Sequence, residues 1–212
     1  MKIYISFLVK SILAGFMIGI GGTIFLSCSN KFIGAVLFAI GLFVIVTRDF
    51  NLFTGKIGYI FENSPKYFIE VVVTLIGNFI GTFIVGSILR YTRIAQIIIP
   101  KANEMCIIKL SDNILSIIVL SFFCGMLMYI AVNGYKTISD IVGKNIILFI
   151  CVVVFILCGF EHCIANMYYF SISNIWNLKS LLYLLIMIFG NSLGGVFIPL
   201  SNKLIISKKD VI

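Results

Sequence analysis

Six long apolar stretches dominate the pattern of hydrophobic and polar positions along the chain. They lie near residues 6–28, 32–47, 67–90, 112–133, 145–171 and 180–206, and short polar segments separate them. A helix needs about 20 mainly apolar residues to cross a bilayer. The stretches lack the strict alternation of transmembrane strands, so the pattern predicts an all-α membrane protein with six spans.

Composition supports a membrane location. Hydrophobic residues make up 61% of the chain and charged residues 11%, whereas soluble domains are roughly half apolar and a quarter charged. The net charge of +8 comes from cations in short loops and tails beside apolar spans, not on one soluble face. This placement favours contact with the lipid bilayer, and we expect no nucleic-acid partner.

The distribution of cations between the two sides predicts orientation. No cleavable signal pattern follows the first span, which we expect to remain in the mature protein. With both termini placed in the cytoplasm of a multi-pass cell-membrane protein, the inner side receives the larger share. The inner cations are Lys2, Lys66, Lys136, Lys144, Lys203, Lys208 and Lys209, and the outer ones are Lys31, Arg90, Arg93, Lys101 and Lys179.

An internal repeat organises the chain. Span three carries GNFIG at 77–81 and span six carries GNSLG at 190–194. Span two is interrupted by RDFNLFTG at 48–55, and span five by CGFEHC at 158–163. Each half of this single pore domain, 1–212, contributes three spans, at about 5–100 and 105–207. The second half therefore enters the membrane from the opposite side, which predicts an inverted repeat.

The matched interruptions predict where a pore would lie. Unwound backbone at mid-membrane persists only where it lines a cavity or is packed in protein, so two breaks in inverted halves indicate a transport site. The alternative is that glycine and polar residues merely kink helices that pack closely. A matched pair of breaks favours the pore.

The residues at the breaks resemble the two signatures of the formate/nitrite transporter family. These are LFTG at 52–55 and GFEHCIANM at 159–167, and the similarity in spacing runs through nearly the whole chain. The resemblance implies an aquaporin-like helical fold, a homopentamer with one pore per protomer, and transport of small anions such as formate, nitrite or hydrosulfide. It implies neither an enzyme nor a cofactor.

The resemblance also assigns roles along the pore. Thr54 matches the threonine of the interrupted span two, and His162 matches the central pore histidine. Glu161 and Asn166 lie in the same signature as His162. Lys109, at the mouth of span four, matches a vestibule lysine, whereas Lys10 is about one turn out of register with a second. The constriction candidates are Phe38 and Phe155 on the outer side and Leu42, Leu52 and Phe53 on the inner side.

The chemistry of His162 fits a weak-acid pore. An ionisable side chain inside a membrane usually marks a substrate path or proton relay. An imidazole changes charge near pH 6.5, so it can donate a hydrogen bond or, when charged, lend a proton. A bare anion loses much hydration free energy in an apolar constriction, and its protonated form loses far less. The alternative is a packing histidine that bonds Thr54 or a free carbonyl.

Several features depart from the family pattern or keep other functions open. Asn51 replaces a frequent acidic residue, Gly125 replaces an asparagine, and the adjacent charges of Arg48 and Asp49 are expected to neutralise one another. Lys109 could instead extend toward headgroups. One histidine and cysteines without CxxC predict no metal site. A pore for neutral solutes would share the repeat but use paired Asn-Pro-Ala breaks, which are absent, and a non-transporting scaffold remains an alternative.

Overall fold

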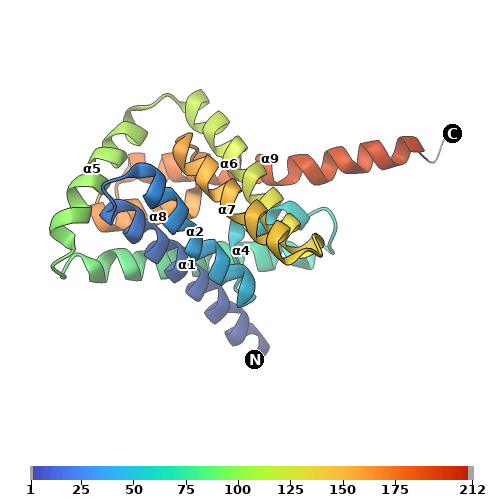
Figure 1. Cartoon of the computed structure of the whole chain (residues 1–212), viewed down its shortest axis with the longest axis horizontal. Helices are drawn as coiled ribbons and strands as arrows, with labels where there is room; N and C mark the ends of the chain where they lie inside the picture. The colour runs from blue at the N-terminus through green and yellow to red at the C-terminus, as the bar shows by residue number, and fades with distance from the viewer. Residues whose placement is uncertain (1, 210–212) are drawn as a thin grey trace.

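The computed structural model describes residues 2–209, and side chains from 5 to 205 (Figure 1). Residue 1 and residues 210–212 of the predicted 1–212 domain lie outside this range. The described chain is helical and contains no strand, which confirms the all-α class. Its elements are α1 (Lys2–Ser27), α2 (Lys31–Thr47), α3 (Phe53–Lys56), the 3₁₀ helix η1 (Ile57–Tyr59), α4 (Lys66–Leu89), α5 (Ala95–Ser111), α6 (Ile114–Thr137), α7 (Ile141–Leu157), α8 (Cys163–Ser173) and α9 (Leu178–Lys209).

The six predicted spans correspond to four long helices and two broken ones. Helices α1, α4, α6 and α9 are long and apolar enough to cross a membrane. The other two spans are broken into α2 with α3 and α7 with α8, and the breaks fall inside the predicted interruptions. The first and second halves therefore have the same order of helix, broken helix and helix, in the inverted, aquaporin-like arrangement.

Both breaks begin with the same helix-ending backbone conformation. Asp49 and Gly159 adopt positive φ angles of 53° and 71°, just beyond the last turns of α2 and α7. The next amide donates back into the helix in each case, from Phe50 N to Ile45 O and from Phe160 N to Phe155 O, both at 2.9 Å. This is the Schellman pattern that ends helices. Gly159 adopts it without strain, whereas Asp49 carries a side chain in the left-handed region.

The two halves pack in the same way. Helix α1 makes its most extensive contacts with α4, and α6 with α9. The repeated GNxxG glycines lie at these crossings. A Cβ atom at Gly81 would overlap the carbonyl oxygen of Ile12 in α1, and one at Gly194 would overlap that of Phe122 in α6. The glycines let the paired backbones touch, so the sequence repeat is a packing repeat.

Helix α5 was not expected from the apolar pattern. Its 17 residues connect the two halves and include Pro100 and several charges, so the segment is too polar to register as a span. The helix packs on α8 through Ile98, Ala102 and Cys106 (Figure 1). Lys109, which was predicted at the mouth of span four, lies in the last turn of α5, shortly before α6 begins.

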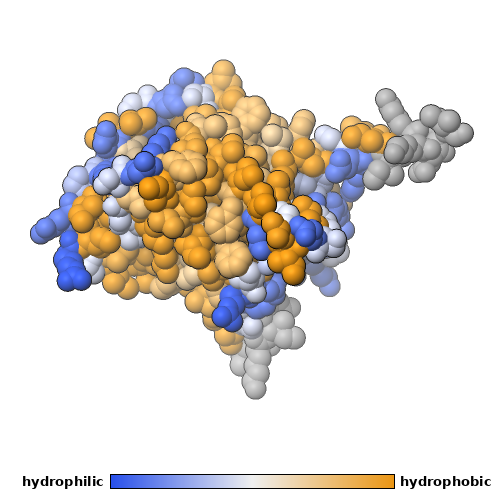
Figure 2. All heavy atoms as spheres, in the orientation of Figure 1, coloured by the Kyte–Doolittle hydropathy of each residue, from blue (hydrophilic) through white to orange (hydrophobic). Residues whose placement is uncertain are grey.

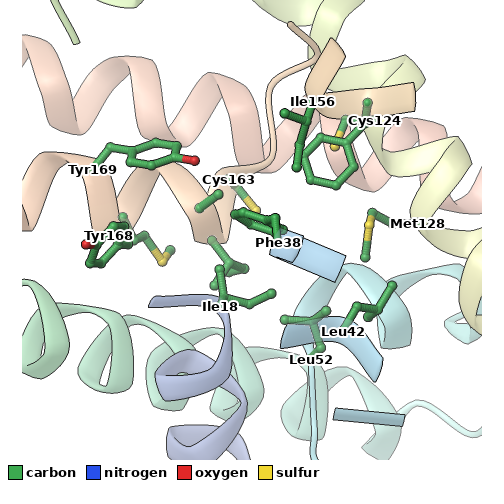
Figure 3. Packing of buried hydrophobic residues seen from close by; sticks show 14 of the residues in the cluster. Ile18, Phe38, Leu42, Leu52, Cys124, Met128, Ile156, Cys163, Tyr168 and Tyr169 are labelled. Atoms are coloured by element: carbon green, nitrogen blue, oxygen red, sulfur yellow. The ribbon is translucent and has the colours of Figure 1, made fainter. Parts of the chain in front are cut away.

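The surface and the interior are both apolar. Orange, hydrophobic residues cover much of the visible face, and polar residues gather toward its edges (Figure 2). Large side chains such as Ile69, Ile76 and Leu185 are more than half exposed. A surface of this kind needs lipid or protein to cover it. Inside, Phe38, Leu42, Leu52 and Ile18 converge between the broken helices (Figure 3).

Candidate functional site

An asparagine on α4 holds the first break in place. The Oδ1 atom of Asn78 accepts a hydrogen bond from the Phe53 amide at 2.8 Å, at the start of α3. Its Nδ2 atom donates to the carbonyl oxygens of Ser11 at 2.7 Å and Asn51 at 2.8 Å. One buried side chain thus satisfies two backbone groups that the interruption frees inside the membrane, and it also links the break to a carbonyl of the continuous helix α1.

An asparagine on α9 does the same for the second break. Asn191 Oδ1 accepts from the Cys163 amide at 2.8 Å, at the start of α8. Its Nδ2 atom donates to the carbonyl oxygens of Ser121 at 2.7 Å and Glu161 at 2.8 Å. We call Asn78 and Asn191 the amide clamps. Their matched bonds make Leu52 and His162 structural counterparts, each directly before its short helix.

The two breaks meet at His162 and Thr54. His162 Nε2 lies 3.0 Å from Thr54 Oγ1, and both side chains are buried. The other ring nitrogen, Nδ1, accepts a hydrogen bond from the Ala165 amide at 3.1 Å and so caps α8. Because a backbone amide only donates, Nδ1 carries no proton in this geometry. The ring proton therefore lies on Nε2, directed at the Thr54 hydroxyl.

A buried polar network adjoins His162. Lys109 Nζ lies 2.5 Å from Glu161 Oε2, and the two side chains are only 12% and 5% exposed. Asn166 Nδ2 donates to the same carboxylate oxygen at 2.8 Å and to the His162 carbonyl oxygen at 3.0 Å. Lys109 therefore turns inward to a counter-charge, and the alternative of a side chain extended toward headgroups is wrong.

This network borders a cavity of about 560 Å³, which we call the Lys109 cavity. His162, Asn166 and Phe155 form part of its wall, and α5 contributes Lys109 and Lys101. The other two lysines of this wall, Lys31 and Lys101, donate hydrogen bonds to backbone carbonyls. Lys31 Nζ donates to the Leu157 carbonyl oxygen at 3.2 Å, and Lys101 Nζ donates to that of Cys28 at 2.9 Å. These lysines neutralise the carboxyl ends of helices α7 and α1.

A second cavity of about 310 Å³, the Lys56 cavity, is bordered by the loop before α3. Leu52 and Asp49 line it together with Lys56 and Lys136. Neither of these lysines was assigned to the pore from the sequence, and Lys136 was counted only among the inner cations, because lysines near span ends are usually anchors. Asp49 Oδ2 pairs with Lys10 Nζ at 2.6 Å. The expected neutralisation of Asp49 by Arg48 is therefore wrong, since Lys10 supplies the counter-charge.

Buried apolar side chains pack near the contact between the two breaks. The rings of Phe38 and Phe155 meet edge to face with centroids 5.9 Å apart, and Phe155 stacks on His162 at 5.6 Å. Leu42, Leu52 and Phe53 are at most 3% exposed. Figure 3 shows Phe38, Leu42 and Leu52 close together in this region. The contact therefore places an imidazole and a hydroxyl beside buried apolar side chains, and we call the set Phe38, Phe155, Leu42, Leu52 and Phe53 the apolar barrier.

Gly125 has a packing role that the sequence did not indicate. A Cβ atom there would overlap the backbone carbonyl of Asn191, and a Cβ at Gly15 would overlap that of Asn78. Each glycine thus lets a clamp-bearing helix approach its neighbour. Among the described residues, no group of three or more His, Cys, Asp or Glu side chains is arranged to hold a metal ion.

Comparisons with known proteins agree on one family. The family profile described as formate/nitrite transporter matches residues 3–202. A formate-nitrite transporter of Plasmodium falciparum is 24% identical, with the match covering 92% of this chain and 75% of the relative. One of Plasmodium knowlesi is 25% identical, covering 77% of this chain and 62% of the relative.

Solved structures share the fold. A pentameric formate channel with formate bound superposes with a TM-score of 0.78 at 22% identity, covering 96% of this chain and 98% of that one. A channel described as an FNT family ion channel gives a TM-score of 0.77 at 21% identity, covering 91% and 86%. These neighbours are channels rather than enzymes.

Proposed function

The chain belongs to the formate/nitrite transporter family, and from this premise we propose that each protomer conducts small monovalent weak-acid anions such as formate, nitrite or hydrosulfide. The observation that carries the proposal is the contact between His162 and Thr54. It joins the two breaks at 3.0 Å inside an apolar barrier that lies between two cavities. A packing histidine would not require a cavity on either side.

The apolar barrier selects the neutral acid. A bare anion between the rings of Phe38 and Phe155 would lose its water without gaining a counter-charge, which costs several kcal/mol or more. The protonated acid avoids most of that loss. Desolvation itself favours the neutral form of a weak acid, so the anion takes a proton from cavity water as it leaves the Lys109 cavity. The neutral species then crosses the barrier.

His162 aids this protonation as a hydrogen-bond donor. Its Nε2–H group polarises the Thr54 hydroxyl, which can turn its own proton toward the permeating oxygen or sulfur atom. Loading a second proton on the ring would require Nδ1, and that atom is engaged by the Ala165 amide. The role we propose for His162 is therefore to stabilise the acid at the centre, while water supplies the proton.

We propose the same assembly and orientation that the sequence predicts. The solved channel with the same fold is described as a pentamer, and the apolar surface of this protomer can be covered by copies of itself and by lipid. The cations at loops and tails favour a multi-pass cell-membrane protein with both termini in the cytoplasm. Labelling of added terminal tags in intact and permeabilised cells tests that orientation.

Flux of the three anions into proteoliposomes tests the proposed function. His162→Phe removes the donor and leaves an apolar ring, so anion flux should fall roughly tenfold or more. His162→Asn keeps both a helix cap and a donor, so it should retain measurable flux with the wild-type pH profile. Size-exclusion chromatography of each variant checks that the assembly is intact.

Other outcomes would identify the alternatives. Wild-type flux of His162→Phe with an unchanged pH profile would make the histidine a packing residue. A flattened pH profile for His162→Asn would instead mean that the imidazole itself titrates during transport. Movement of neutral solutes without anions would support a neutral-solute pore. An assembled wild type that moves neither class would support a scaffold.

A further inference from the structure

The Lys56 cavity has two lysines in its wall from different elements. Lys56 ends α3, two residues after Thr54, and Lys136 lies in the last turn of α6. Both line the same cavity of about 310 Å³, whose wall also includes Leu52 and Gly55 of the pore loop. A small hydrated anion fits in this volume, directly beside the apolar barrier.

The positive charge of Lys56 is only weakly compensated. Its Nζ atom lies 3.9 Å from Glu70 Oε2, and the lysine side chain is 23% exposed while the glutamate is half exposed. The ammonium group also lies over the rings of Phe7 and Tyr67, 5.1 and 5.4 Å from their centroids. These ring contacts hold the ammonium in place without cancelling its charge.

Lys136 is held in a similar way. Its Nζ atom lies over the Tyr59 ring, 4.6 Å from the centroid. Among the residues whose side chains are described, it has no carboxylate within salt-bridge distance. Asp49 is the only acidic residue among the described residues of the cavity wall, and its carboxylate is paired with Lys10 Nζ at 2.6 Å. Two ammonium groups thus face this cavity without a tight counter-charge.

The Lys109 cavity is different in this respect. Lys109 is paired with Glu161 at 2.5 Å, and Lys31 and Lys101 donate to helix-end carbonyls. We propose that Lys56 and Lys136 form a second anion-binding subsite, which receives or releases the small monovalent anion on the side of the barrier away from Lys109. This inference rests on the proposed anion transport.

The subsite works by raising the local anion concentration. At about 7 Å through water-like surroundings, one unit charge changes the occupancy of an anion by about threefold. Two lysines therefore give roughly an order of magnitude at low ionic strength, and salt should screen most of that gain. Lysine ammonium groups are point charges, so the subsite should accept formate, nitrite and hydrosulfide alike.

The experiment measures flux from the Lys56 side in proteoliposomes at low and high ionic strength. Orientation is followed with an impermeant maleimide at Cys158, which is exposed beside the Lys109 cavity. The test variants are Lys56→Met, Lys136→Met and the double variant. The control is Lys179→Met, because Lys179 also lies over a ring, that of Tyr183, and neither of these two residues lines a cavity.

The expected result is a rise in the half-saturating concentration of formate from the Lys56 side. It should be about threefold for each single variant and about tenfold for the double variant at low salt. The difference from wild type should shrink at high salt, and Lys179→Met should behave as wild type. A double variant equal to Lys179→Met would overturn the subsite while leaving transport intact. Absence of any anion flux in the wild type would instead overturn the proposed function.

Discussion

At the residue scale, each amide clamp holds a break in place through three hydrogen bonds from one side chain. The sequence revealed the repeated GNxxG motif, but it gave no sign that each asparagine bonds two backbone groups of a break and one carbonyl of a neighbouring helix. The hydrogen-bonding partners of Asn191 lie 28 to 70 residues away. Such contacts depend on the folded arrangement of three helices, and residue spacing alone cannot reveal them.

Removing a clamp should unfold its break. Asn191→Leu has nearly the right volume but leaves the Cys163 amide and the Glu161 carbonyl without these partners, and it removes the bond that links the break to the Ser121 carbonyl of α6. Each unsatisfied buried group costs about 1–3 kcal/mol. We expect the variant to lose assembled protein or melt at a much lower temperature, as measured by fluorescence-detected chromatography after heating. Asn78→Leu should do the same, and stability equal to wild type in both would contradict the clamp role.

The Lys109–Glu161 pair predicts a rescue. Lys109→Met leaves the Glu161 carboxylate without its cation at the wall of the Lys109 cavity, where it would repel anions. Adding Glu161→Gln removes that charge and keeps an oxygen that can accept from Asn166. Formate flux at low ionic strength should therefore be lower for Lys109→Met than for the double variant. Equal flux in both would mean that the lysine charge alone controls access.

At the scale of elements, the apolar pattern predicted the spans and both breaks, but it missed α5. The spans can be recognised in the sequence because a helix that crosses lipid needs a long run of apolar residues. Helix α5 does not need such a run, since it packs on α8 and carries three charged residues, Lys101, Glu104 and Lys109, among its 17 residues. The partners of Lys109 and Lys10 were missed for a related reason. Their counter-charges lie 52 and 39 residues away.

The end of α2 offers a test of backbone strain. Asp49 occupies the left-handed region that its counterpart Gly159 fills. Asp49→Gly should be nearly neutral in stability, because relief of about 1 kcal/mol of strain offsets the lost ion pair with Lys10. Asp49→Val should lower stability, because a β-branched residue is disfavoured at positive φ. Thermal melting of the purified assemblies compares them, and equal melting temperatures for both variants would argue against strain at this position.

At the scale of the whole molecule, the inverted repeat was predictable because both halves keep the same order of motifs. The assembly was expected only from resemblance, since apolar side chains cover many faces of the protomer and lipid or protein can cover each. We expect native mass spectrometry of the protein in detergent to give five copies per particle. A monomer or dimer under conditions that preserve membrane oligomers would contradict the pentamer.

The amide clamps also have a consequence for biosynthesis. The Phe53 amide emerges from the ribosome 25 residues before Asn78, and the Cys163 amide emerges 28 residues before Asn191. At about 5–20 residues per second, each broken span therefore waits one to several seconds for the side chain that satisfies it. Because each clamp belongs to the same half as its break, the first half can complete its hydrogen bonds before the last span is translated. A nascent chain stopped after residue 100 should already protect its break from water.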